Sequence, residues 1–248
     1  MKSISLLFFL GLFSIHAFSQ KDARESYVLT TPIVIDGDPS EWSVDWLIDQ
    51  DGKFLYNIGN DDTNLYFRIK ISDDLTQQKI ALFGLNLKLN AEGKKKGRVG
   101  LKYPVGKDAR QLKKAPEPLP QDAASKVIAK KQLLDEVEIL ELIGLAKDNI
   151  VSSRLGLMNG IEALIVVADD GSYLYEAKIP FKAFKINKSS TPILGVTIET
   201  SKPNLANNST SAPAGNQQNS ARGFGQTGYG QYNPIMTPAY MWVAIKLK

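Results

Sequence analysis

Residues 65–72 alternate strictly between apolar and polar side chains, and this pattern constrains the fold more than any other in the chain. The apolar positions are Leu65, Phe67, Ile69 and Ile71, and the polar ones are Tyr66, Arg68, Lys70 and Ser72. Successive side chains of a β-strand point to opposite faces of the sheet. The period of two therefore predicts a strand with one face in a core and the other in water.

Further strands are predicted wherever this alternation or a run of β-forming residues recurs. They are expected at residues 27–35, 54–58, 79–90, 99–103, 137–145, 161–168, 172–179, 191–200 and 241–247. Residues 137–145 fit a helical period as well as an alternating one, and we prefer the strand. Asp169-Asp170-Gly171 lies between two of these runs and predicts a hairpin turn. Residues 123–134 are predicted as a short helix.

About nine or ten short strands with at most one short helix predict an all-β fold. The expected architecture is an antiparallel β-sandwich of jelly-roll type. The stretch from Ser201 to Pro238 is rich in Asn, Ser, Gly and Gln and almost lacks aliphatic residues, so it cannot bury enough surface to order itself. Because alternation resumes after it, residues 204–238 are expected to form a flexible insertion loop before the last strand.

The first residues have the pattern of an export signal. A basic start precedes an apolar run over residues 4–13, which is shorter than the roughly 20 residues of a membrane-spanning helix, and small residues follow at Ala17 and Ser19. This predicts a secretory signal peptide over residues 1–19 and a single β-sandwich domain over residues 20–248. The protein is expected to be secreted or periplasmic, at the cell envelope, with no transmembrane segment after cleavage.

Two residue types that carry much of enzyme chemistry are nearly absent. The chain has no cysteine, and its one histidine, His16, lies in the predicted signal peptide. The mature chain therefore cannot build a Ser-His-Asp or Cys-His nucleophile, a zinc site of the usual nitrogen and sulfur kind, or a His-ligated haem. Calcium, which oxygen atoms bind, stays a candidate. The net charge of +4 is not gathered into a basic stripe, so nucleic acid is not an expected partner.

Three motifs follow one another along the chain. They are IVIDGDPSEW at residues 33–42, DDTNLYF at residues 61–67, in a stretch that ends at Asp73, and YEAKIPF at residues 175–181. This set resembles family-9 carbohydrate-binding modules and their wider relatives among DOMON-like sandwiches. The resemblance implies a β-sandwich and a non-catalytic protein that binds carbohydrate. The sugar-binding members of the family hold sugars with aromatic side chains, with polar residues and calcium nearby.

The candidates for sugar stacking are Trp46, Tyr229, Tyr232 and Trp242. Trp242 is opposite in phase to its apolar neighbours, which places it on the outer face of the last strand. The two tyrosines lie among glycines and amides of the insertion loop, a composition that adapts to sugar hydroxyls and rings. Trp42 belongs to the first motif and is expected in the core.

Two acidic corners are candidates for calcium, with Asp36, Asp38 and Glu41 in the first and Asp61 and Asp62 in the second. A complete calcium loop needs more ligands than either run supplies, and acidic residues also suit turns because they bond the local backbone. Both roles stay open.

The tip at residues 91–98 carries most of the local positive charge. It is predicted as a solvated hairpin turn with edge-protecting lysines, the alternative being a patch for acidic glycans.

Other functions stay open beside carbohydrate binding. The main alternative is a structural or partner-binding envelope protein on the same scaffold, which would engage another protein through the insertion loop. A glycoside-hydrolase-associated role would need two facing carboxylates, and among 26 acids no pair stands out. A haem role is remote without histidine. The expected activity is therefore binding and not catalysis.

Overall fold

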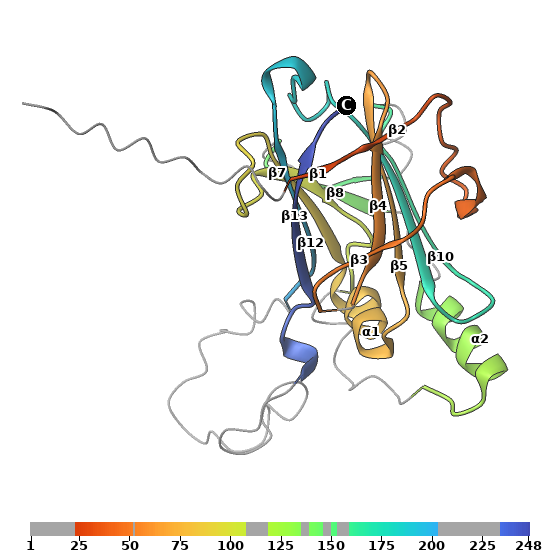
Figure 1. Ribbon diagram of the computed structural model, residues 1–248. Coiled ribbons are helices and arrows are strands. Elements are labelled where there is room, and N and C mark those ends of the chain that lie inside the picture. The colour runs from red at the N-terminus through yellow and green to blue at the C-terminus, as the bar shows by residue number, and fades with distance from the viewer. Residues whose placement is uncertain are drawn as a thin grey trace, which may run out of the picture.

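The computed structural model describes residues 23–51, 53–107, 119–134, 139–145, 150–152, 159–202 and 234–248. These residues form two β-sheets that face each other across an apolar core (Figure 1). The predicted all-β sandwich is therefore confirmed. The predicted signal peptide and residues 204–233 of the predicted insertion lie outside the described residues.

One sheet has seven strands and the other has six. The order in the seven-stranded sheet is β1 (Arg24–Glu25), β13 (Tyr240–Lys246), β12 (Leu194–Thr200), β6 (Leu85–Asn90), β7 (Val99–Lys102), β8 (Ile139–Ile143) and β9 (Ile150–Ser152). The order in the six-stranded sheet is β10 (Glu162–Val167), β11 (Tyr173–Pro180), β5 (Asn64–Ile71), β4 (Leu55–Asn60) and β2 (Tyr27–Val28), and β3 (Leu47–Ile48) also pairs with β4. Among the described strands, β1 with β13 and β2 with β4 pair in parallel and the other pairs are antiparallel, so both sheets are mixed.

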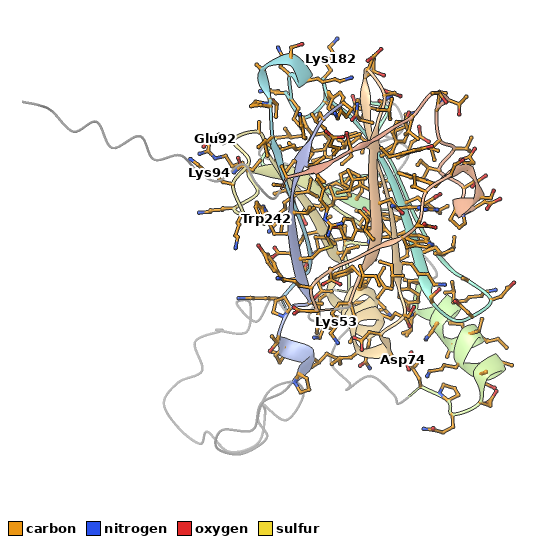
Figure 2. The ribbon with its side chains drawn as sticks, viewed as in Figure 1. Lys53, Asp74, Glu92, Lys94, Lys182 and Trp242 are labelled. Atoms are coloured by element: carbon orange, nitrogen blue, oxygen red, sulfur yellow. The ribbon has the colours of Figure 1, made fainter. Side chains whose placement is uncertain are left out.

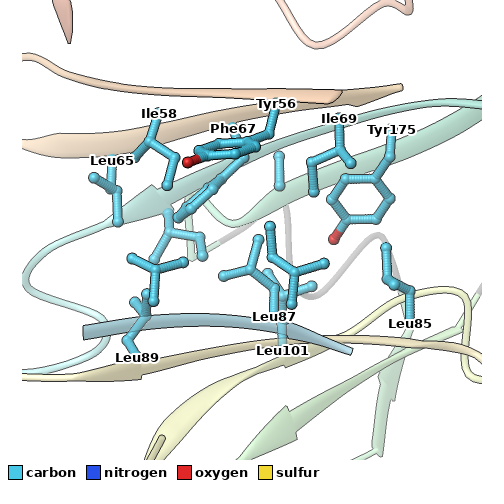
Figure 3. Packing of buried hydrophobic residues seen from close by; sticks show 14 of the residues in the cluster. Tyr56, Ile58, Leu65, Phe67, Ile69, Leu85, Leu87, Leu89, Leu101 and Tyr175 are labelled. Carbon is cyan, nitrogen blue, oxygen red and sulfur yellow. The ribbon is translucent and has the colours of Figure 1, made fainter. Parts of the chain in front are cut away.

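The core lies between the inward faces of the two sheets. Leu85, Leu87 and Leu89 of β6 face Phe67 and Ile69 of β5 across it (Figure 3). All five side chains are fully buried. Burying apolar side chains stabilises the fold by about 1.5–3 kcal/mol each, so these two alternating strands account for a large share of the sandwich's stability.

Most of the polar face of β5 is covered, contrary to the prediction for residues 65–72, and only its end at Lys70 is partly exposed. Tyr66 and Arg68 are 0 % and 4 % exposed. Residues 29–46, which we call the strap, cross the outer face of the six-stranded sheet and cover both side chains. Trp42 of the strap packs so closely on Gly59 that a Cβ there would lie 3.2 Å from its ring. The predicted strand at residues 27–35 is correspondingly short, because most of it belongs to this crossing segment.

The prediction of a strand over residues 79–90 is wrong in its first half, where the chain forms helix α1 (Asp74–Phe83). Asp73 caps the helix by accepting a hydrogen bond from the Thr76 amide at 2.9 Å, and Gly84, with φ of +91°, ends it. The helix closes one end of the sandwich (Figure 1). With α2 (Ala123–Leu134), which was predicted, the described residues contain two α-helices and not one.

The other predicted elements are present. Residues 139–143 form a strand, the hairpin joins β10 to β11, and the last strand pairs with β12. Residues 234–236, predicted as loop, form a short 3₁₀ helix, and the Ala239 amide donates a hydrogen bond to Thr200 Oγ1. Within the described ranges, no helix is long and apolar enough to cross a membrane.

Candidate functional site

The two outer faces of the sandwich differ. The strap covers that of the six-stranded sheet, whereas the outer face of the seven-stranded sheet, which we call the open face, is covered only in part by the described residues. Its outward polar and aromatic side chains follow from the strand alternation and are Asn86, Lys88, Lys102, Glu141, Thr197, Glu199, Tyr240 and Trp242. Apolar Ile139, Ile143 and Ala244 face the same way, and Ile139 is exposed. The open face is therefore mainly polar and aromatic, with a few apolar side chains, over five neighbouring strands.

Strand register sets these side chains in two rows. One row runs through Tyr240, Glu199, Asn86, Lys102 and Glu141, which are successive cross-strand partners. The second row starts with Trp242 and continues through Thr197 and Lys88 in the same way. Neighbours within a row are close enough to contact one ligand together.

The polar groups of the open face hold one another in place. Lys88 pairs with Glu199 at 2.5 Å, and their side chains are each about one quarter exposed. Asn86 Nδ2 donates a hydrogen bond to Ser201 Oγ at 3.0 Å. Burial lowers the pKa of Lys102, and the carboxylate of Glu141 opposes this shift. The face therefore presents donors and acceptors with fixed positions.

Residues 91–98, which we call the lysine loop, join the antiparallel strands β6 and β7 as the predicted hairpin turn, and most of them are exposed. Their backbone folds back over the open face, where the Lys95 and Lys96 carbonyls accept hydrogen bonds from Thr197 Oγ1 at 2.9 Å and from Asn90 Nδ2 at 2.5 Å, respectively. A Cβ at Gly97 would lie 2.3 Å from Lys88 Cβ, so this approach needs glycine. The lysines thus lie over central strands and not at a sheet edge.

Trp242 lies on the outer face of β13, as its phase predicted. Its side chain, labelled in Figure 2, is half-buried. The Lys95 ammonium lies 5.3 Å from the ring centroid. The indole nitrogen is buried and has no hydrogen-bond partner among the described residues. Tyr240, two residues earlier, is 42 % exposed and is the more accessible of the two rings.

Trp46 lies on the other side of the sandwich, at the end of the strap. The Arg68 guanidinium stacks 4.1 Å from its ring centroid, so the fold itself uses one face of the ring. A shallow, open depression of about 530 Å³ beside it is lined by residues 42–45. Because Trp46 and Trp242 lie on opposite outer faces, they do not form one clamp. Tyr229 and Tyr232 lie outside the described residues.

The first acidic corner uses its carboxylates to shape the strap. Asp36 Oδ1 accepts from the Asp38 amide, and Asp38 Oδ1 accepts from the Ser40 amide, each at 2.9 Å. Glu41 Oε2 accepts from the Val34 amide at 2.9 Å. These are the local bonds by which acidic residues stabilise turns.

The second corner is similar. Partial burial acts to raise the pKa of Asp61, but hydrogen bonds from the Thr63 and Asn64 amides and from the Tyr66 hydroxyl outweigh it and lower that pKa to about 2. Asp62 is exposed and pairs with Lys188 at 3.0 Å. Over the described ranges, no three acidic or histidine side chains converge as metal ligands. Calcium binding stays a prediction.

Calcium is tested by thermal unfolding with a millimolar excess of calcium and then with EDTA. Because the corner oxygens already accept hydrogen bonds, we expect Tm to change by less than about 1 °C. The exposed Asp51 lies outside both corners, so Asp51→Asn is the control variant. A rise of several degrees that Asp36→Asn and Asp61→Asn abolish, but that Asp51→Asn retains, would instead establish a structural cation at these corners.

Glu176 is the buried acid that faces the strap. It is 2 % exposed, it is the cross-strand partner of Arg68, and its Oε2 accepts from the Gly37 amide at 2.9 Å. Its Oε1 has no partner among the described residues. Burial raises the pKa of Glu176 to about 7, with Asp36 and Glu41 adding to the shift and the Gly37 amide opposing it. These contacts give Glu176 a structural role in holding the strap.

A scan against protein-family models and a search of curated proteins find no match. Among the chains that a search of solved structures finds are two structures of a family-9 carbohydrate-binding module from Caldicellulosiruptor kristjanssonii. The one in complex with glucose is 13% identical, with a TM-score of 0.34, and the match covers 74% of this chain and 79% of that one. The one in complex with cellotriose is 11% identical, with a TM-score of 0.33 and coverage of 71% and 75%. The likeness concerns the same family that the sequence motifs resemble.

Proposed function

We propose that the protein is a non-catalytic carbohydrate-binding protein that acts outside the cytoplasm and binds glycan on the open face. One observation carries this proposal: Tyr240 and Trp242 lie beside amide and charged side chains on a broad sheet face that the described residues leave partly uncovered. On the opposite outer face, the strap covers Tyr66 and Arg68, and the Arg68 guanidinium already occupies one face of the Trp46 ring.

The chemistry of the open face suits a sugar chain. A pyranose ring has apolar C–H faces, which pack on aromatic rings, and hydroxyls, which need hydrogen-bond partners when they leave water. Tyr240 supplies an exposed ring. Asn86, Glu199 and Lys102 lie next to it in the same row and supply an amide, an acceptor and a donor. Since their positions are already fixed, binding costs less conformational entropy.

The test is binding of the protein to a panel of neutral and acidic polysaccharides by isothermal titration calorimetry. Tyr240→Ala and Trp242→Ala are each expected to weaken binding by about tenfold, since one stacked ring contributes on the order of 1.4 kcal/mol. Trp46→Ala is the matched variant on the opposite face and should leave affinity unchanged, with circular dichroism checking that each variant is folded.

The opposite pattern would contradict the proposal. Loss of binding with Trp46→Ala alone would move the site to the strap, and failure to bind any glycan of the panel would exclude the function.

A further inference from the structure

The lysine loop gives the open face a surplus of positive charge. The loop contains Lys94, Lys95, Lys96 and Arg98 and a single acid, Glu92. Glu92 pairs with Lys94 at 2.6 Å and with Arg98 at 2.7 Å. Lys95 and Lys96 are exposed, and within the described ranges neither has a carboxylate at ion-pair distance. Lys95 and Lys96 are therefore available to pair with an anionic ligand.

The backbone that carries these two cations is anchored over the sheet. The backbone carbonyls of Lys95 and Lys96 are the ones that Thr197 and Asn90 bind. A Cβ at Gly195 would lie 2.4 Å from the Lys94 carbonyl oxygen, so the loop also packs directly on β12. A charged side chain loses less conformational entropy on binding when its backbone is already anchored on the binding face than when it stands on a mobile tip.

Lys95 also joins the charge to an aromatic ring. Its ammonium lies over Trp242, 5.3 Å from the ring centroid, and Trp242 is next to Tyr240 along the outward face of β13. An anion that pairs with Lys95 is thereby held beside the Trp242 ring. A sugar that carries a carboxylate meets both requirements, because its ring and its charge are only a few bonds apart.

We propose that the ligand of the open face is an acidic polysaccharide, in which carboxylates of the sugar units pair with Lys95 and Lys96 while the rings contact Trp242 and Tyr240. This inference rests on the proposed function and adds the charge class of the glycan. A neutral glycan would find the same rings and amides but would leave the two cations without a partner. Charge complementarity therefore favours the acidic polymer.

The experiment compares polymers that share a backbone and differ in charge. Carboxymethylcellulose is set against hydroxyethylcellulose, and polygalacturonate against its fully methyl-esterified form, each titrated with the whole protein at low and high salt. We expect the acidic member of each pair to bind at least about tenfold more tightly at low salt. The difference should shrink as salt screens the exposed charges.

Charge-removing variants distinguish binding at a defined site from general electrostatic attraction. Lys95→Gln with Lys96→Gln should reduce affinity for the acidic polymers about tenfold and leave the neutral ones unchanged. Lys131→Gln with Lys182→Gln removes the same charge from exposed positions on other elements and should have no effect.

Each result that departs from these expectations leads to a different conclusion. Equal binding of acidic and neutral polymers, insensitive to Lys95 and Lys96, overturns this inference and leaves the proposed function standing. Binding to none of the four polymers overturns both. Equal losses of affinity in the two double variants would show unspecific attraction of polyanions and would also overturn the inference. The same conclusion would follow if nucleic acid or anionic vesicles bound equally tightly and Tyr240→Ala did not weaken that binding.

Discussion

Replacing Arg68 by methionine is expected to lower the free energy of unfolding by about 3–5 kcal/mol. Arg68 joins β5 to the strap, because its guanidinium donates to Asn57 Oδ1 at 2.8 Å and to the Pro39 carbonyl at 3.0 Å, and also to the Val44 carbonyl. Methionine keeps much of the volume but leaves these acceptors without a donor. It also removes the cation that faces buried Glu176.

The measurement is chemical denaturation of the wild type and the variant. Lys70→Met, two residues further along the same strand, is the matched control, since Lys70 pairs with Asp170 at 2.7 Å in a partly exposed position and should contribute less than about 1 kcal/mol. Arg68→Lys keeps the charge without the planar fork and should fall between the two. Equal losses for Arg68→Met and Lys70→Met would mean that Arg68 does not hold the strap.

The alternating pattern predicted most of the strands correctly, but it could not show which polar faces are covered. The predicted strand is present as β5, yet its polar face is buried at Tyr66 and Arg68 and only partly exposed at Lys70. The cover comes from residues 29–46, and its contacts depend on tertiary packing of Trp42 on Gly59 and of Gly37 on Glu176. A local period reports how side chains divide between two faces and not what lies over each face.

Helix α1 was missed although its boundary signals are present in the sequence. Asp73 precedes it as an N-cap, and Gly84 follows its last residue. The apolar residues at its C-terminal end run directly into those of β6, and alternation in β6 was extended backwards over Ile80 and Phe83. Greater weight on the cap and the glycine would have divided the segment at the correct place.

The candidate site was predictable only in part. The phase of Trp242 along the last strand indicated its outward position correctly. The approach of the lysine loop to β12 could not be derived, because it depends on a contact between Lys95 and Thr197, which are far apart in the chain, and on glycine at position 97. Thus the composition of the loop indicated its charge, and tertiary packing decided where that charge lies.

Raising the pH from about 4.5 to about 7.5 is expected to lower the free energy of unfolding by roughly 2 kcal/mol through Glu176. Burial raises the pKa of this carboxyl from 4.5 to about 7 in the folded protein. The folded state therefore holds the proton more tightly than the unfolded one. This stabilisation is complete at pH values below the pKa of Glu176 in the unfolded chain. It is lost as the pH rises through the pKa of Glu176 in the folded protein, because the carboxyl group must then ionise beside Asp36 and Glu41 under the strap.

Glu176→Gln should remove this dependence of the free energy of unfolding on pH. Glutamine keeps the shape of the side chain and can accept a hydrogen bond from the Gly37 amide, but it does not ionise. The contribution of Glu176 is the difference in the free energy of unfolding between wild type and variant, measured by chemical denaturation at a series of pH values. Glu162→Gln, a partly exposed acid paired with Lys178 on the same sheet, should retain the wild-type slope. The only histidine, His16, precedes the described residues, so no described histidine titrates in this window. A wild-type pH dependence that persists in Glu176→Gln would mean that other groups produce it and that folding does not raise the pKa of Glu176.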